Sequence, residues 1–439
     1  MLGPLRAHTQ RTLRLPLYAL PRALSIVALS AICGGLISWN GLLAHQMATK
    51  LHMNDFGKLY YSARAFLQAR DMYGLTPATS MPVGEGQYHT FLNLNPPHFH
   101  IPLLPLALLP PELALALWGI ASVVALVVSL RLIVGEVGLT LTPRRLLLGM
   151  IGVLGFAGTG AVAATGQVSF LLLLPITLAW IEARRGRWAR AGAYLGLAAS
   201  VKLFLLIFVP YLVLRRRFRA VAAAAGTAGL CFAVGLLLFG VDAHRSWLRA
   251  LSSPDWAWAA MNGSILGLLT RTLSESPYYS PLLSAPGLIT PIWLAAAGLA
   301  GMLTMVAAAS RPTDPNVDRD FALLSLASQL ISPLGWVYCL WLPVGPLAAL
   351  IATWRRERES EGIRSVPFLA RWRDRFLLLA TPGLVWPLFG TTLFQPHRWA
   401  TVVVGSVYFW ATFALWLSLL VDWRLNVVRS HREQMPPLW

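Results

Sequence analysis

The sequence predicts an all-α integral-membrane protein, a polytopic helical bundle formed by a single domain of residues 1–439. The chain is 56% hydrophobic and only 12% charged, whereas soluble proteins carry about 25% charged residues. Several apolar runs reach the roughly 20 residues that a helix needs to cross a bilayer. A transmembrane barrel would need short alternating strands, and the run 113–134 does not alternate.

Ten apolar segments and one hairpin predict about 10–12 membrane helices. The spans are expected to be helical because lipid offers no partner to a free backbone N–H or C=O group. The expected spans lie at about 21–43, 112–134, 146–164, 168–183, 219–240, 288–309, 320–335, 336–353, 376–394 and 399–421. The apolar segment of the first span, about Ala23 to Ala44, follows Arg6, Arg11, Arg14 and Arg22. It is longer than a signal-peptide core, so we expect an uncleaved signal anchor.

The net charge of +18 is compatible with a nucleic-acid surface or with a membrane protein that keeps positive loops on one side. The expected spans place most of the Lys and Arg residues in short loops on a single side, which is the positive-inside bias. The three cysteines, Cys33, Cys231 and Cys339, all fall in apolar segments and indicate no disulfide framework.

Segment 191–214 decides the topology, because arginine clusters flank it on both sides. A single crossing would place one cluster outside and would export the arginine-rich run 355–375. We therefore expect a helical hairpin with its tip near Lys202 and with arms of about 18 Å. Such hairpins are tolerated where protein buries them. Both termini then lie in the cytoplasm, and the outer face carries two long loops, 44–111 and 241–287.

Asp55 is the first candidate for chemistry, because apolar residues at helical spacing follow it from Phe56 to Arg70. A helix at the outer interface, with aromatic residues at headgroup depth, fits this pattern. One interpretation makes Asp55 the N-cap of that helix. The other makes it a general base for an acceptor hydroxyl, and the two roles are compatible.

Lys202 is the second candidate, since it is a charge in the middle of an apolar segment. Such a charge is costly unless paired and marks a functional site by default. No carboxylate lies mid-span to pair with it, so an anionic lipid phosphate is the natural partner. The alternatives are snorkelling and a bond to open carbonyls at the hairpin tip.

Other candidates lie at breaks between the apolar segments. Asn95, His98 and His100 precede a proline-rich stretch that prevents a regular helix. The two histidines lack a third ligand at a recognisable spacing, so we expect hydrogen bonding or packing rather than a metal. Gln167 lies in an outer turn between spans, and Trp336 and Tyr338 lie in another; a plain turn and an aromatic belt are the alternatives there.

The sequence contains no nucleophile elbow, no Gly-rich phosphate loop and no dinucleotide fingerprint, which disfavours a soluble nucleotide-sugar donor. The absence of mid-span carboxylates disfavours a proton-coupled transporter.

Taken together, the motifs resemble glycosyltransferase family 87 of the GT-C superfamily, the polyprenyl-phosphate-mannose-dependent mannosyltransferases. The matching residues run in order along most of the chain: Asp55-Phe56, Tyr60-Tyr61, Ala63-Arg64, Asp71-Met72-Tyr73, Asn95-Pro96-Pro97, 105–110, 166–169, Lys202-Leu203, 215–219, Asn262 with Ser264, and Ser332-Pro333 with Trp336. The family often carries a His pair shortly after the last motif, where this chain has Tyr338-Cys339.

The resemblance implies a GT-C membrane fold whose active site faces outward and whose acidic residue after the first span, Asp55, is catalytic. We expect a hexose, mannose above all, to move from a polyprenyl-phosphate donor to a lipid or glycan acceptor with inversion. The donor phosphate would be bound by Lys58, Arg64, Lys202 and Arg271. Sugar or lipid contacts are expected from Tyr60, Tyr61, Asn95, His98, Gln167, Trp256, Trp258, Asn262, Trp336 and Tyr338.

The expected enzyme works in the cell (inner or plasma) membrane, needs neither cofactor nor metal, and binds no nucleic acid. Three alternatives stay open on the sequence: transfer of arabinofuranose or another lipid-linked sugar, a polysaccharide polymerase or ligase, and a non-enzymatic glycolipid transporter. The departure at Tyr338-Cys339 leaves the acceptor open as well.

Overall fold

A computed structural model describes residues 19–49, 55–84, 87–89, 92–252, 256–310, 316–361, 368–385 and 398–434. Apart from one short hairpin of β1 (Met81–Gly84) and β2 (Gln87–His89), the regular structure in these ranges is helical. The α-helices of the first half are α1 (Ala19–Thr49), α2 (Asp55–Leu67), α3 (Pro111–Val137), α4 (Pro143–Leu154), α5 (Ala157–Thr165), α6 (Ser169–Arg184), α7 (Trp188–Val201) and α8 (Phe208–Leu214). Those of the second half are α9 (Phe218–Leu251), α10 (Ile265–Leu273), α11 (Ile289–Ala309), α12 (Val317–Ile331), α13 (Val344–Glu361), α14 (Phe368–Val385), α15 (Arg398–Val403) and α16 (Val407–Gln434). The 3-10 helices are η1 (Pro97–Leu103), η2 (Leu106–Leu108), η3 (Leu203–Ile207), η4 (Pro286–Leu288) and η5 (Val337–Trp341).

The all-helical membrane class is confirmed, and each predicted span other than 376–394 overlaps one helix or a pair of helices. Among the described residues, four helices are long and apolar enough to cross a membrane: α1, α3, α9 and α11 with η4. The pair α4 and α5, bent by 56°, makes a fifth if it counts as one span. The predicted number of 10–12 is larger because several expected spans are shorter helices, such as α6 with 16 residues and α12 with 15. The predicted span 376–394 runs beyond the described residues after Val385.

The chain reversal predicted for 191–214 is present in the structure. Helix α7 ends at Val201, and Lys202 has the extended backbone that separates it from η3 and α8. The Arg217 guanidinium lies 4.6 Å from the ring of Trp188, so the chain returns to the level at which α7 began. Gly192 and Gly196 lie directly against the backbone of Ala220 and Ala224, so α9 then runs beside α7 in the same direction. How the hairpin lies in a membrane, and on which side each terminus lies, stays a prediction.

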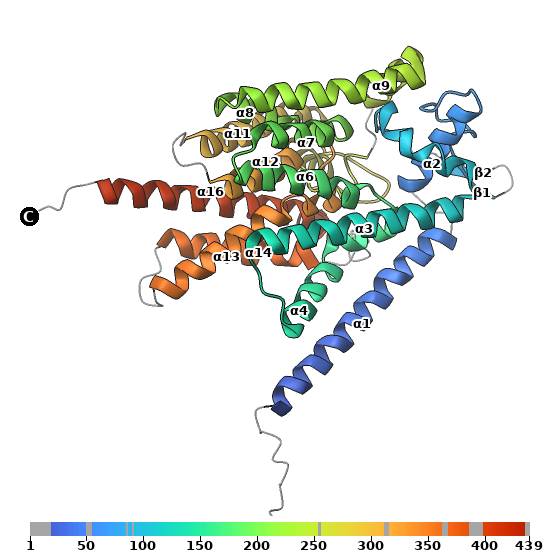
Figure 1. The fold of residues 1–439 in the computed structure, drawn as a ribbon. Helices are drawn as coiled ribbons and strands as arrows, with labels where there is room; N and C mark the ends of the chain where they lie inside the picture. Colours follow the sequence, from blue (N-terminus) through green and yellow to red (C-terminus); the bar gives the residue numbers. More distant parts are fainter. Residues whose placement is uncertain are drawn as a thin grey trace, which may run out of the picture.

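The bundle has two different ends (Figure 1). Helix α2 and the β1–β2 hairpin gather at one end, together with the C-terminal part of α9, whereas the end of α13, the start of α14 and the C-terminal part of α16 lie at the other. The second end carries buried ion pairs, including Arg373 with Asp422 at 3.2 Å and Arg319 with Asp320 at 3.7 Å. The large apolar core lies between these ends, chiefly among α6, α7, α12 and α16.

Candidate functional site

Asp55 opens α2, and its carboxylate forms an ion pair with Lys58 one turn further on. Both side chains are partly accessible, at 14% and 16% of their full surface. The rest of the helix is anchored by apolar burial, because Phe56 and Leu59 are almost completely enclosed. A rigid helix therefore presents one carboxylate and one ammonium group together, at the end of the bundle where α2 lies.

Lys202 lies at the tip of the reversal, where α7 stops. Its Nζ atom donates a hydrogen bond to Oδ1 of Asn95, 3.2 Å away. Asn95 is itself fixed, because Asn93 Oδ1 accepts from its backbone N–H and the hydroxyl of Tyr73 donates to its carbonyl at 2.7 Å. Within the described residues, no carboxylate oxygen lies within 4 Å of Nζ. The hairpin tip thus holds a cation against a neutral amide.

Tyr338 joins these groups to η5. Its phenol lies near the Gln167 side chain and within electrostatic range of the Asp55 carboxylate. Lys202 is likewise within electrostatic range of Asp55 and Lys58. Five separate segments of the chain therefore bring predicted site residues together: α2, the stretch before η1, the turn before α6, the hairpin tip and η5.

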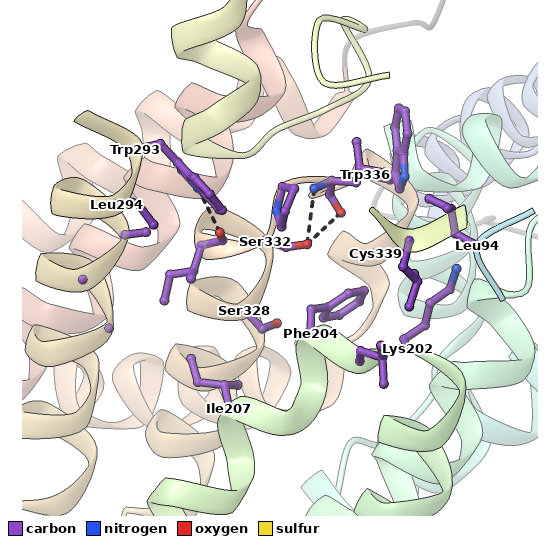
Figure 2. A pocket seen from close by; sticks show the side chains of 18 of the residues that line it. Leu94, Lys202, Phe204, Ile207, Trp293, Leu294, Ser328, Ser332, Trp336 and Cys339 are labelled. Carbon is purple, nitrogen blue, oxygen red and sulfur yellow. Dashed lines mark hydrogen bonds between the residues drawn. The ribbon is translucent and has the colours of Figure 1, made fainter. Parts of the chain in front are cut away.

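A cavity of about 820 Å³ adjoins this cluster (Figure 2). Lys202 and Cys339 lie on one side of it, and Trp293 and Leu294 on the other. Among the described residues that line it, Lys202 is the only charged one. The remaining lining is mostly apolar and comes from the hairpin tip, α11 and the end of α12: Val201, Leu203, Phe204, Ile207, Ala297, Gly298, Gly301, Met305 and Ile331, among others. A long apolar chain with an anionic head matches this lining.

A buried polar network holds η1 against α2, and the sequence analysis missed two of its members, Ser62 and Asn93. The Asn93 amide donates to Ser62 Oγ at 2.9 Å and to His100 Nε2 at 2.7 Å. His100 Nδ1 must then carry the proton, which it donates to the Pro96 carbonyl at 3.2 Å. Burial lowers the pKa of His100 to about 4, so the ring is neutral. No short motif announces Ser62, whose role depends on tertiary contact alone.

His98 packs on α9, where its Cβ and backbone lie against Gly235, and its imidazole lies near the backbone of Ser200 at the end of α7. Burial is the main cause that lowers the pKa of its imidazole. In the described ranges, no group of three or more His, Cys, Asp or Glu side chains is arranged to hold a metal ion. His98 thus packs between η1 and α9, and its contact with sugar or lipid stays a prediction.

Asn262 crosslinks the segment 257–264 to the loop before η5. Its Nδ2 atom donates to the carbonyls of Ala257 and Pro333, and its Oδ1 atom accepts from the backbone N–H of Ser264 and Gly335. A short antiparallel bridge between Asn262 and Trp336 completes the junction. All polar atoms of the amide are engaged within the protein. Asn262 thus fixes the segment that carries Trp336 into the cavity wall.

Arg271, expected beside Lys202 at the donor phosphate, does not line the cavity that Lys202 lines. It is fully buried, and its guanidinium donates to Ser406 Oγ at 2.9 Å, to the Ala259 carbonyl at 2.7 Å and to the Asn262 carbonyl at 3.1 Å. These bonds hold the segment 259–262 around the guanidinium group. The predicted loop 241–287 in turn displays Trp258 stacked on Tyr278 at 4.6 Å, with Trp256 beside it.

The other aromatic and basic residues of α2 also separate from Asp55. Tyr60 is buried, donates its hydroxyl proton to the Leu109 carbonyl at 2.6 Å and packs edge-on against Tyr61. Arg64 is exposed and lies against the Tyr60 hydroxyl. Arg64 and Asp55 are nine residues apart, which places them on opposite faces of the helix, about 180° apart.

Comparison with known proteins agrees with this assembly. A model of the family described as Glycosyltransferase family 87 matches residues 93–333, more than half of the chain. The match includes Asn95, Gln167, Lys202 and Asn262; it does not include Asp55.

Two characterised relatives cover most of the chain. One, from Mycobacterium tuberculosis, is named a polyprenol-phosphate-mannose-dependent alpha-(1-2)-phosphatidylinositol mannoside mannosyltransferase; it is 25% identical over 447 residues, 93% of each chain. The other, from Mycolicibacterium smegmatis, is named for phosphatidylinositol pentamannoside and is 27% identical over 335 residues, 73% of this chain and 74% of its own length. The family match, supported by these relatives, shows that this chain is a multi-pass membrane glycosyltransferase belonging to glycosyltransferase family 87.

Proposed function

We propose that this enzyme moves a mannosyl group from polyprenyl-phosphate mannose to a hydroxyl of a lipid-linked mannoside at the outer face of the membrane. The names of the relatives support the donor and the kind of acceptor. The observation that carries the proposal is the meeting of the Asp55–Lys58 pair with Lys202 beside a large apolar cavity.

The donor fits the cavity by its chemistry. Its polyprenyl chain is apolar and lies along the walls formed by Phe204, Ile207 and Met305. Its phosphate lies at the Lys202 end, where Nζ is held ready by Asn95. An isolated buried ammonium is costly, and an anion repays that cost. In this proposal the donor phosphate supplies the negative charge that no carboxylate of the described residues provides to Lys202.

The transfer is a single displacement. The acceptor oxygen attacks the anomeric carbon while the bond from that carbon to the phosphate oxygen breaks, so the configuration inverts. The proton of the attacking hydroxyl passes to the carboxylate of Asp55, which acts as general base. The leaving phosphate gains a negative charge as the bond breaks, and Lys202 and Lys58 stabilise that charge in the transition state.

The two positions at which the family often has histidines carry Tyr338 and Cys339 here, and both lie at the site. Tyr338, which lies near Gln167 and Asp55, occupies the position of one of the family's histidines and supplies a phenol in place of an imidazole. We therefore assign Tyr338 a contact with the sugar rather than a proton transfer.

The test is transfer by the purified protein in nanodiscs, with radiolabelled polyprenyl-phosphate mannose and a membrane-lipid extract as acceptor. We expect Asp55→Asn to abolish the labelled product while donor binding survives. Asp242→Asn, whose side chain is exposed at 95%, is the matched control and should behave as wild type. Transfer that persists in Asp55→Asn would remove the carboxylate from catalysis and leave it as a helix cap. Wild-type protein that ignores this donor but accepts an oligosaccharide-diphospholipid would point to a polymerase or ligase.

A further inference from the structure

A second cavity, of about 570 Å³, lies on the face of α2 that points away from Asp55. Arg64 and Gln68, one helical turn apart, line it together with Tyr60 and the stretch 107–111. Lys58 and Lys202 do not line this cavity. The cation of Arg64 is therefore available to a ligand that does not share the Lys202 site.

The wall around Arg64 is preorganised. The Tyr60 hydroxyl donates to the Leu109 carbonyl and so ties α2 to the start of α3. The guanidinium of Arg64 rests against the oxygen of the same hydroxyl. In the part of the chain that the structure describes, no carboxylate oxygen lies within 4 Å of Arg64. Glu112, in the first turn of α3, is within electrostatic range of the Tyr60 hydroxyl but does not line the cavity.

The surface around this cavity is apolar and open. Leu108 is exposed at 75%, Leu113 at 48%, Leu67 at 44% and Leu117 at 40%. Exposed leucines on α3, a helix long and apolar enough to cross a membrane, are the surface that acyl chains cover. A guanidinium surrounded by such a surface matches a group that is anionic and attached to lipid, because its planar fork binds phosphate oxygens in pairs.

We propose that the Arg64 cavity binds the phosphodiester of the acceptor lipid, on the opposite side of α2 from the donor phosphate. This inference rests on the proposed function. Nine residues of helix separate Arg64 from Asp55, about 13 Å along the axis. A glycan headgroup has to bridge that distance to bring its reacting hydroxyl to Asp55. The separation therefore selects acceptors by the length of headgroup between the phosphate and the reacting sugar.

The test compares Arg64→Gln with Arg70→Gln, an exposed arginine beyond the end of the same helix. Transfer is measured with a phosphatidylinositol-linked mannoside and with a soluble mannoside that lacks a phosphodiester. We expect Arg64→Gln to raise the KM for the lipid acceptor about 10- to 100-fold, the usual loss for a charge-assisted hydrogen bond. The KM for the donor, and transfer to the soluble mannoside, should stay at wild-type values. Arg70→Gln should match wild type throughout.

Three results would overturn the assignment. A rise in the donor KM would place Arg64 at the donor site. An equal loss with the soluble mannoside would make its role structural, and unchanged kinetics with both acceptors would leave the cavity without a ligand.

A binding measurement separates this proposal from the proposed function. Native mass spectrometry of the protein in mixed phosphatidylinositol and phosphatidylcholine should show retained phosphatidylinositol that Arg64→Gln loses, even if no transfer is found. Equal retention of both lipids, or displacement of phosphatidylinositol by inorganic phosphate at millimolar concentration, would contradict a lipid phosphodiester site.

Discussion

The ammonium group of Lys202 donates a hydrogen bond to the Oδ1 atom of Asn95 across 107 positions of sequence. This bond joins the tip of the α7–α8 reversal to the segment that precedes η1, and it leaves the positive charge without a counter-charge within salt-bridge distance in the described residues. A protein gains no stability from such an arrangement, so we expect the charge to bind an anionic ligand.

Replacing Lys202 by methionine should separate binding from stability. The apolar side chain of similar length loses the charge-assisted bond to the donor phosphate, so donor affinity should fall about 10- to 100-fold. The midpoint of thermal unfolding should stay equal or rise, because the substitution removes an unpaired charge from the apolar wall of the cavity. Donor titration and thermal unfolding of the same nanodisc sample measure both quantities.

Lys202→Arg is the control for charge alone. It keeps the positive charge but presents a planar fork in place of a compact ammonium, so intermediate donor affinity is expected. Lower stability together with unchanged donor affinity in Lys202→Met would show that the lysine is structural.

The sequence predicts the helices well because apolar length is a local signal, and it predicts their ends less well. The expected helix 56–70 ends at Leu67 because Ala69 adopts a left-handed φ of 56° and the N–H of Arg70 bonds back to the carbonyl of Ala65. Glycine or asparagine usually occupies that position. Because alanine occupies this position, the sequence contains no residue that predicts the end of the helix at Leu67.

The site is predictable only where a residue is unusual for its surroundings. Lys202 is recognised because a mid-segment charge is rare, and Asp55 because it opens an amphipathic helix. The sequence does not show that Arg271, in the predicted loop 241–287, differs from Lys202 in what it binds. The difference lies in their partners, because backbone carbonyls from distant positions occupy the guanidinium of Arg271, and only the folded chain brings those carbonyls together.

The neutral state of His100 predicts a loss of stability in mild acid. Its pKa in the folded protein is about 4, against about 6.5 in an unfolded chain, so the unfolded chain takes up the proton first as the pH falls. The free energy of unfolding should therefore be highest above pH 6.5 and should decrease as the pH falls from 6.5 to about 4. Below pH 4 the contribution of His100 should no longer change. The loss is on the order of 3 kcal/mol. Chemical unfolding at a series of pH values measures it.

His100→Gln is the variant that identifies the source of this slope. It cannot take up a proton, so the part of the slope that belongs to His100 should disappear. Burial also lowers the pKa of His98, so His98→Gln should remove a further part. A slope unchanged in both variants would assign the acid sensitivity to other groups.

Two glycines of α7 allow it to pack directly on α9. A Cβ atom at Gly192 would lie 2.1 Å from the carbonyl oxygen of Ala220, and one at Gly196 would lie 2.2 Å from that of Ala224. Small residues four apart are the usual means by which membrane helices approach closely. Gly192→Ala should therefore force the helices apart and cost about 1–3 kcal/mol, as overpacking does.

Gly226→Ala is the matched control, since a Cβ atom there meets nothing within 4 Å. It should be neutral or stabilising by up to about 1 kcal/mol, because alanine is the better helix former. Thermal unfolding of the three proteins in one detergent compares them. Equal midpoints for Gly192→Ala and Gly226→Ala would mean that the two helices do not pack this closely.

The hydrogen bonds of Asn262 predict that a residue outside the reacting centre controls transfer by positioning. Asn262→Ala removes four bonds that join Ala257 and Ser264 to Pro333 and Gly335, and the backbone groups left buried should lower stability by about 3 kcal/mol. The freed segment carries Trp336 and Tyr338, so kcat should fall more than the donor KM rises. Asn316→Ala, which removes only the cap of α12, should cost about 1 kcal/mol and leave the kcat intact. If Asn262→Ala changed the donor KM alone, Asn262 would have to contact the donor directly, as the sequence first suggested.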